Sequence, residues 1–157
     1  MARRVYFAFH YENASDFRVN VVRNSWVTRG SGQDAGFYDA SLWEKAKTYG
    51  DTGIKKMIDE GLDNTSVTAV LIGAETHARK WVRYEIVKSF ERGNGLLGIH
   101  INCIPDKNVS ILPRGRNPFD DLCFHIGPWH QRATVSELGM SGWVSYAKVP
   151  EVTESEC

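Results

Sequence analysis

A glutamate and a tryptophan four residues apart are the side chains of this sequence best suited to chemistry. Trp81 and Glu85 fall in the stretch KWVRYEIVKSF, and in a helix this spacing puts them one turn apart. A carboxylate can stabilise a developing positive charge, and an indole can form a flat wall of a cleft. The pair predicts an active site in which Glu85 is the catalytic residue.

The apolar stripe of the same helix predicts where Glu85 points. Apolar residues recur every fourth position, at Val82, Ile86 and Phe90. Glu85 lies beside this stripe, so we expect a carboxylate at the edge of the core, partly desolvated but able to reach a cleft. The alternative is a solvated glutamate that pairs with Lys88 or Arg83 while Trp81 packs in the core.

Strand and helix patterns alternate on both sides of this pair. Apolar, β-branched runs predict a central strand at residues 4–9 and further strands at 67–73 and 96–101, with a short strand possible at 36–40. Helical patterns lie between them, and residues 42–51 read as a long connection, a mixed loop or a helical turn. Alternation of this kind implies a flavodoxin-like, three-layer α/β fold with a mostly parallel sheet and helices on both faces. Ligands bind such sheets outside the carboxyl ends of the strands, here between strands 4–9 and 67–73.

Composition limits the classes of protein and partner. A chain of 157 residues with 42% hydrophobic and 24% charged residues fits a single domain, irregular beyond residue 102 and flexible at 150–157. Nineteen basic and nineteen acidic residues cancel, which disfavours nucleic-acid and membrane partners. We see no signal-like segment and expect a cytoplasmic protein with reduced cysteines.

A metal site is not predicted. The candidate ligands are His100, Cys103, Cys123 and His125. Their spacing matches no recognised zinc motif, and His100 alternates with apolar strand residues.

Four segments, taken in order, resemble a Toll/interleukin-1 receptor (TIR) domain. They are RVYFAFHYE, FYDAS, SVTAVLIG and KWVRYEIVKSF. Three others, VVRNSWVT, DASLWEKAK and GLDNTSVTAVLIG, resemble more closely the TIR-like proteins of the bacterial Thoeris anti-phage defence system. The likeness covers about residues 3–121.

The resemblance implies an enzyme that cleaves NAD+ between nicotinamide and ribose, with NAD+ as substrate and no cofactor. It implies that Glu85 is the catalytic glutamate. The substrate-binding residues that it implies are Phe9, His10, Tyr11, Asp39, Trp43 and Trp81. From the residues alone, His10 is as well explained by a structural hydrogen bond as by a general base.

The resemblance also implies a product and partners. The product is a cyclic ADP-ribose isomer that signals to an effector protein, and we expect a phage-derived trigger and self-association on activation. Two alternatives remain open: a TIR scaffold without turnover, and a flavodoxin-like nucleotide-binding module. A carboxylate at the edge of this helix favours the enzyme.

Overall fold

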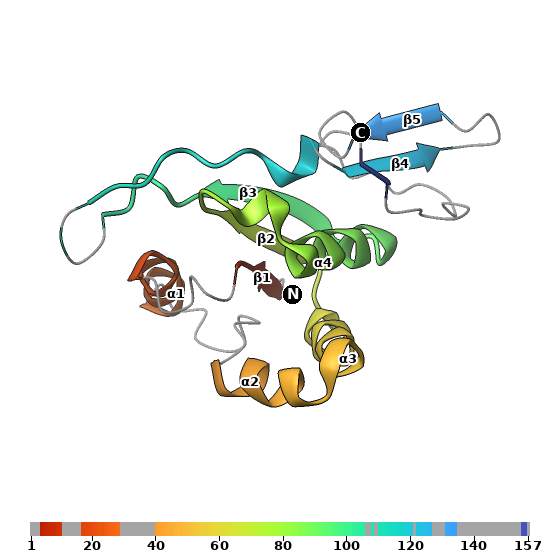
Figure 1. Cartoon of the computed structure of the whole chain (residues 1–157), viewed down its shortest axis with the longest axis horizontal. Helices are drawn as coiled ribbons and strands as arrows, with labels where there is room; N and C mark the ends of the chain where they lie inside the picture. Colours follow the sequence, from red (N-terminus) through yellow and green to blue (C-terminus); the bar gives the residue numbers. More distant parts are fainter. Residues whose placement is uncertain are drawn as a thin grey trace.

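Three parallel strands form the centre of the structure, a computed structural model that describes residues 4–10, 17–28, 40–105, 108, 110–120, 122–126, 131–134 and 155–156. The strands are β1 (Val5–Ala8), β2 (Val67–Ile72) and β3 (Gly95–His100), in the order β1-β2-β3 (Figure 1). Val5 pairs with Val67, and Val67 pairs with Gly95. All three were predicted, and β1 and β2 are neighbours as expected. Among the described strands, however, β2 is central and β1, predicted to be central, lies at one edge.

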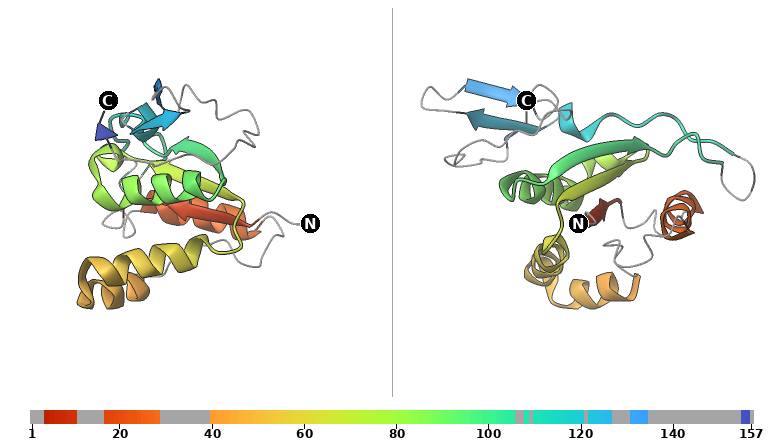
Figure 2. Two further views of the ribbon diagram at one scale, coloured as in Figure 1. Left: turned by 90° about the vertical axis from the view of Figure 1, so that its right-hand side faces the viewer. Right: turned by 180° about the vertical axis from the view of Figure 1, so that it is seen from behind.

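Helices cover both faces of this sheet. Helix α1 (Phe17–Thr28) lies on one side, and α2 (Ala40–Thr48), α3 (Gly50–Leu62) and α4 (Lys80–Glu91) lie on the other (Figures 1 and 2). The predicted three-layer α/β architecture is therefore confirmed. Within the described part of the chain, no helix combines the length and apolar character needed to cross a membrane.

Residues 42–51 correct one expectation, because they are helical and not a long loop. They form most of α2 and the first turn of α3. The two helices meet at Gly50, whose φ of +66° suits glycine. They also approach closely, since a β-carbon at Gly53 would lie 2.6 Å from the carbonyl oxygen of Ala46. The predicted strand at 36–40 lies outside the described residues except for Ala40, which begins α2.

Alternating side chains of β1 and β2 divide the interior into two cores. The α1-side core consists of Val5, Phe7, Val19, Ala69, Leu71 and Ile101. The α4-side core consists of Tyr6, Ala8, Ala46, Ile54, Met57, Ile58, Leu62, Val70, Ile72, Val82, Ile86, Val87, Leu96, Phe119 and Leu122. The four buried apolar residues of α3, Ile54, Met57, Ile58 and Leu62, all belong to this core.

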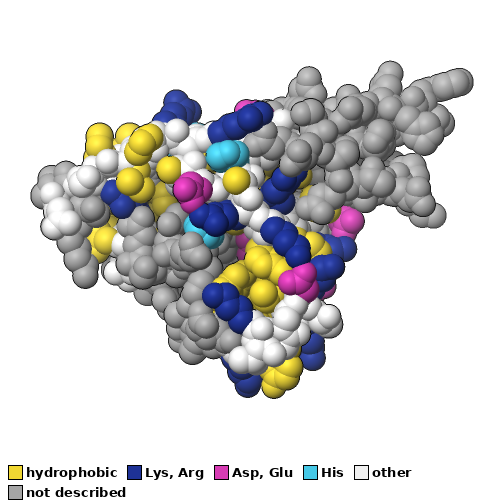
Figure 3. Space-filling model, viewed as in Figure 1, with side chains coloured by type: hydrophobic (Ala, Val, Ile, Leu, Met, Phe, Trp, Pro, Cys, Tyr) yellow, Lys and Arg dark blue, Asp and Glu magenta, His cyan; other side chains and the backbone are white. Residues whose placement is uncertain are grey.

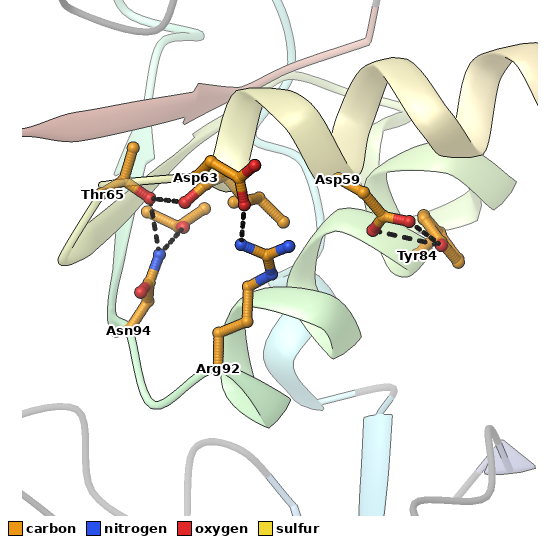
Figure 4. Close-up of polar contacts among 8 residues, drawn as sticks. Asp59, Asp63, Thr65, Tyr84, Arg92 and Asn94 are labelled. Atoms are coloured by element: carbon orange, nitrogen blue, oxygen red, sulfur yellow. Dashed lines mark hydrogen bonds and ion pairs between the residues drawn. The ribbon is translucent and has the colours of Figure 1, made fainter.

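Polar contacts fix α4 beside the end of α3 (Figure 4). Arg92 Nη1 lies 2.6 Å from Asp63 Oδ1, and Asn94 Nδ2 donates to Thr65 Oγ1 at 2.9 Å. The helix ends at Glu91, Arg92 is its C-cap residue, and Gly93 follows with a φ of +76°. A positive φ of this kind suits glycine and turns the chain out of the helix.

The chain beyond β3 returns across the carboxyl end of β2. At Gly115 a β-carbon would overlap the carbonyl oxygen of Gly73, so the two backbones are in direct contact there. The 3-10 helix η3 (Pro118–Asp120) then places Phe119 in the α4-side core.

A second, antiparallel sheet follows η3. It has the order β5-β4-β6 and consists of β4 (Leu122–Ile126), β5 (Gln131–Thr134) and β6 (Ser155–Glu156). The region beyond residue 102, predicted to be irregular, thus contains three strands. Its strands are short, and β6 lies 20 residues of sequence beyond β5, so local patterns gave no sign of their pairing.

Candidate active site

Glu85 lies on the buried side of α4, between the helix and the sheet. Its side chain is 6% exposed, and its neighbours on this side include Val82, Ile86 and Ser89. The expected place at the edge of the core is therefore wrong, because the carboxyl is inside it. The solvated alternative is wrong too, since Lys88 pairs with Glu91 at 2.7 Å.

One tyrosine of β1 binds the buried carboxyl. The Tyr6 hydroxyl donates to Glu85 Oε1 at 2.6 Å, across 79 residues of sequence. The other oxygen, Oε2, is also buried and receives no hydrogen bond from the described residues. A buried polar atom without a partner is costly, so a carboxyl with one free oxygen points to a role other than stability.

Two opposing effects set the ionisation of this group. Burial raises the pKa of Glu85 from its ordinary value of 4.5 to about 8, while the hydrogen bond from Tyr6 lowers it. Desolvation disfavours the charged form and a donated hydrogen bond favours it. The carboxyl is therefore mostly neutral at pH 7, and a cation placed beside it would favour its ionised form.

Trp81 lies one turn before Glu85 and is partly buried against the α4-side core. Tyr84 meets its ring edge-on at a centroid distance of 6.0 Å. Lys80 Nζ lies 4.7 Å from the centre of the indole and 2.5 Å from Asp51 Oδ2 at the start of α3. Figure 3 shows hydrophobic side chains gathered between α4 and the α2–α3 pair, bordered by basic and acidic ones.

The other predicted site residues divide between the two faces of the sheet. Trp43, from α2, packs against the α4-side core together with Trp81. Phe9 packs against the α1-side core, so the structure does not bring it to the same face as Glu85. His10 is partly buried just beyond β1. Tyr11 and Asp39 lie outside the described residues.

The candidate zinc ligands do not form a described cluster. Among the residues that the structure describes, no group of three His, Cys, Asp or Glu side chains could hold a metal ion. Cys103 is exposed, and burial and Arg114 together lower the pKa of His100. The side chains of Cys123 and His125 are outside the described part.

Sequence reasoning missed Tyr6. A signal was available, because Tyr6 is the one polar-tipped side chain in the run VYFA and a buried tyrosine hydroxyl normally needs a partner. The partner itself could not be found from spacing, since β1 and α4 are far apart in the sequence.

Comparisons with known proteins agree with this geometry. The family model described as "Thoeris protein ThsB, TIR-like domain" matches residues 6–105, which include Tyr6, Trp81 and Glu85. A Bacillus cereus (strain MSX-D12) protein named "Putative cyclic ADP-D-ribose synthase ThsB1" is 51% identical over 146 residues, 93% of this chain and 76% of the relative. The resemblance noted in the sequence is thereby confirmed: the chain belongs to the Thoeris ThsB family and carries its TIR-like domain.

Proposed function

We propose that this chain cleaves NAD+ between nicotinamide and ribose and closes the remaining ADP-ribose into a cyclic isomer, with Glu85 as the catalytic residue. The observation that carries the proposal is the buried Glu85 carboxyl, with one oxygen bonded to Tyr6 and the other without a partner from the described residues. The name of the Bacillus cereus relative, a cyclic ADP-D-ribose synthase, supports the same reaction class.

The first step breaks the bond between the ribose carbon and the ring nitrogen of nicotinamide. Nicotinamide takes the electron pair of this bond and leaves neutral, because its ring nitrogen was cationic in NAD+. The positive charge passes to the ribose as an oxocarbenium-like species, which an ionised Glu85 stabilises as it develops. Since the leaving group needs no proton, one carboxylate is sufficient, unlike the pair used by ordinary glycosidases.

The substrate helps to ionise its own catalyst. In the free protein the pKa of Glu85 is about 8, so at pH 7 the carboxyl holds its proton. The cationic nicotinamide ring lowers this pKa when it binds nearby, and the released proton goes to solvent. The counter-charge thus forms when NAD+ is in place.

The second step is capture of the cation by a nucleophilic nitrogen or oxygen of the same ADP-ribose, which then loses a proton. Water competes for the same carbon and gives linear ADP-ribose. Apolar walls that exclude water and fold the nucleotide back favour the internal nucleophile. Trp81 and Trp43, both packed against the α4-side core, are the described aromatic residues that we assign to these walls.

We propose that activation is a conformational change that gives the ribose of NAD+ access to the Glu85 carboxyl. Glu85 Oε2 is inaccessible in this conformation, so α4 or the groups that cover it must move before the ribose can reach it. We propose that self-association or a phage-derived trigger favours the open form. The cyclic product then signals to a separate effector protein in Thoeris defence.

Incubation of the protein with NAD+ at increasing protein concentration, followed by liquid chromatography and mass spectrometry, tests the proposal. We expect nicotinamide and a product one water lighter than ADP-ribose, with linear ADP-ribose as a minor product. Linear ADP-ribose alone would refute cyclisation and leave NAD+ cleavage standing. Unchanged NAD+ in the presence of the self-associated, triggered protein would refute both.

A further inference from the structure

The Tyr6 hydroxyl is enclosed as completely as the carboxyl that it binds. Tyr6 is 1% exposed and comes from β1, whose other residues are all apolar. A phenylalanine would fill the same apolar space without an oxygen that needs a partner. The hydroxyl therefore has a purpose beyond packing, and it donates a hydrogen bond to Glu85 Oε1 at 2.6 Å.

We infer that Tyr6 is a positioning residue that stabilises the ionised form of Glu85 and fixes Oε1, so that Oε2 remains for the ribose of NAD+. The inference rests on the proposed NAD+-cleaving function. A short hydrogen bond from a phenol to a carboxylate is charge-assisted, and it is stronger than the same bond to a neutral carboxyl. Tyr6 therefore favours the charged state that the cleavage step uses.

No other group on the neighbouring elements shares this task. Of the elements packed against α4, β2 carries no titratable side chain. The other elements packed against α4, and α4 itself, carry titratable side chains. These side chains either bind other partners or do not shift the pKa of Glu85. They are His77 of η2 (Thr76–Ala78), His100 of β3, Asp51, Lys55, Lys56, Asp59 and Glu60 of α3, and Lys80, Arg83, Tyr84, Lys88 and Glu91 of α4.

The Glu85 backbone is fixed independently of Tyr6. Ser89 Oγ donates to the Glu85 carbonyl oxygen at 2.6 Å and accepts from Thr68 Oγ1 at 2.8 Å. Because this chain of bonds anchors α4 to β2, loss of the Tyr6 hydroxyl leaves the helix in place. The change should therefore appear in the ionisation and orientation of the carboxyl.

The test is a titration of the Glu85 carboxyl in the full chain, labelled with 13C at glutamate Cδ, with its signal assigned from Glu85→Gln. Tyr6→Phe should raise the pKa of Glu85 by about one unit, the value of one hydrogen bond to a charged group. Tyr84→Phe is the matched control. It removes a hydroxyl group from the residue that precedes Glu85 in the sequence, and this hydroxyl lies 3.4 Å from Asp59 Oδ1. It should leave the Glu85 titration unchanged.

The pH profile of NAD+ turnover gives the second readout. In Tyr6→Phe the rising limb of the kcat/KM profile should move to higher pH by the same interval, and kcat/KM at pH 7 should fall about tenfold. If Tyr6→Phe does not fold, 3-fluorotyrosine at position 6 keeps the shape and is a stronger donor, so it should lower the pKa of Glu85.

Three outcomes would each overturn a different part of the inference or of the proposed function. An unchanged Glu85 titration in the position-6 variants would overturn the role of Tyr6. A shifted titration with an unshifted turnover profile would overturn its role in catalysis. A shifted titration in a protein that does not consume NAD+ would support the Tyr6–Glu85 coupling and overturn the proposed function alone.

Discussion

The two faces of the central sheet are built from the same strands but hold different kinds of interior. On the α1 side, Val5 and Phe7 of β1 meet Ala69 and Leu71 of β2, and the buried residues of that core are apolar. On the α4 side, the alternate residues of the same strands include Tyr6 and Thr68. A strand of four residues thus supplies both a hydrophobic core and a hydrogen-bond donor.

The difference supports the proposal that the α4 face carries the function. A core needs no carboxyl, and burying one without full compensation costs free energy. The α4 side nevertheless holds Glu85, with its raised pKa, and a hydroxyl chain through Thr68 and Ser89. On the α1 side, the charged side chain of Arg18 is also buried. It donates to the carbonyl oxygen of Ser110 at 2.7 Å, and this bond connects α1 to the segment that follows β3. The α1 face thus consists mainly of apolar packing, and the α4 face is the one on which we propose that the chemistry takes place.

The largest effect should come from removing the charge on the α4 face. Glu85→Gln keeps the size of the side chain and abolishes the counter-charge, so NAD+ turnover should fall by at least about a thousandfold. Nicotinamide release measured by liquid chromatography checks this. Glu91→Gln, on the same helix but bound to Lys88 near solvent, is the matched control and should retain turnover. Substantial turnover in a folded Glu85→Gln protein would exclude Glu85 as the catalyst.

The same substitution should change stability in a pH-dependent way. The pKa of Glu85 is about 8 in the folded protein and near 4.5 when unfolded. Below about pH 4.5, Glu85 therefore makes its full contribution to the free energy of unfolding. This contribution is lost as the pH rises from about 4.5 to about 8, and it does not change further above pH 8. Relative to wild type, Glu85→Gln should gain roughly 4 kcal/mol in free energy of unfolding between pH 4.5 and pH 9.

Urea unfolding at a series of pH values measures this gain. Parallel curves for wild type and Glu85→Gln would mean that Glu85 is not buried in a neutral form.

On the other face, a change in β1 should affect stability and not chemistry. Phe7→Leu removes part of a buried ring that is 2% exposed and should lower the free energy of unfolding by roughly 1–2 kcal/mol. Turnover per folded molecule and its pH profile should stay at wild-type values below the unfolding transition. A shifted pH profile would show that the two faces are coupled through the sheet.

The smallest effect should come from the rim of the α4 face. Lys80 and Asp51 are both 64% exposed, so Asp51→Asn should change stability by less than about 0.5 kcal/mol. The difference should shrink as salt is added, because exposed charges are screened. Thermal unfolding at low and high ionic strength measures both effects, and a large salt-independent loss would mean that this ion pair is structurally important.

The sequence allowed the elements to be predicted better than the way they pack. β-branched runs located β1, β2 and β3, and the helical stripe located α4. Helix α2 was missed, because Tyr49, Gly50 and Asp51 read as loop residues although they mark only a corner between two helices.

The depth of Glu85 in the core was not predicted. The stripe of α4 placed Glu85 at the edge of the core, since the periodicity of one helix cannot tell how closely the sheet approaches it. Alternation within β1 could have placed Phe9 correctly, because it shares a face with Phe7 and not with Tyr6. The catalytic role of Glu85 and the substrate-binding roles of the other residues, including Tyr11, Asp39 and His10, stay predictions.

The contact between Gly115 and Gly73 bears on where the cooperative folding unit ends. The family match stops at residue 105, yet Phe119 and Leu122 complete the core around Glu85, and position 115 admits no side chain where the returning chain crosses β2. A polypeptide cut at the limit of the recognised domain would lose these residues and expose the apolar surface that they cover. The family match is therefore shorter than the unit that must fold to enclose the Glu85 carboxyl.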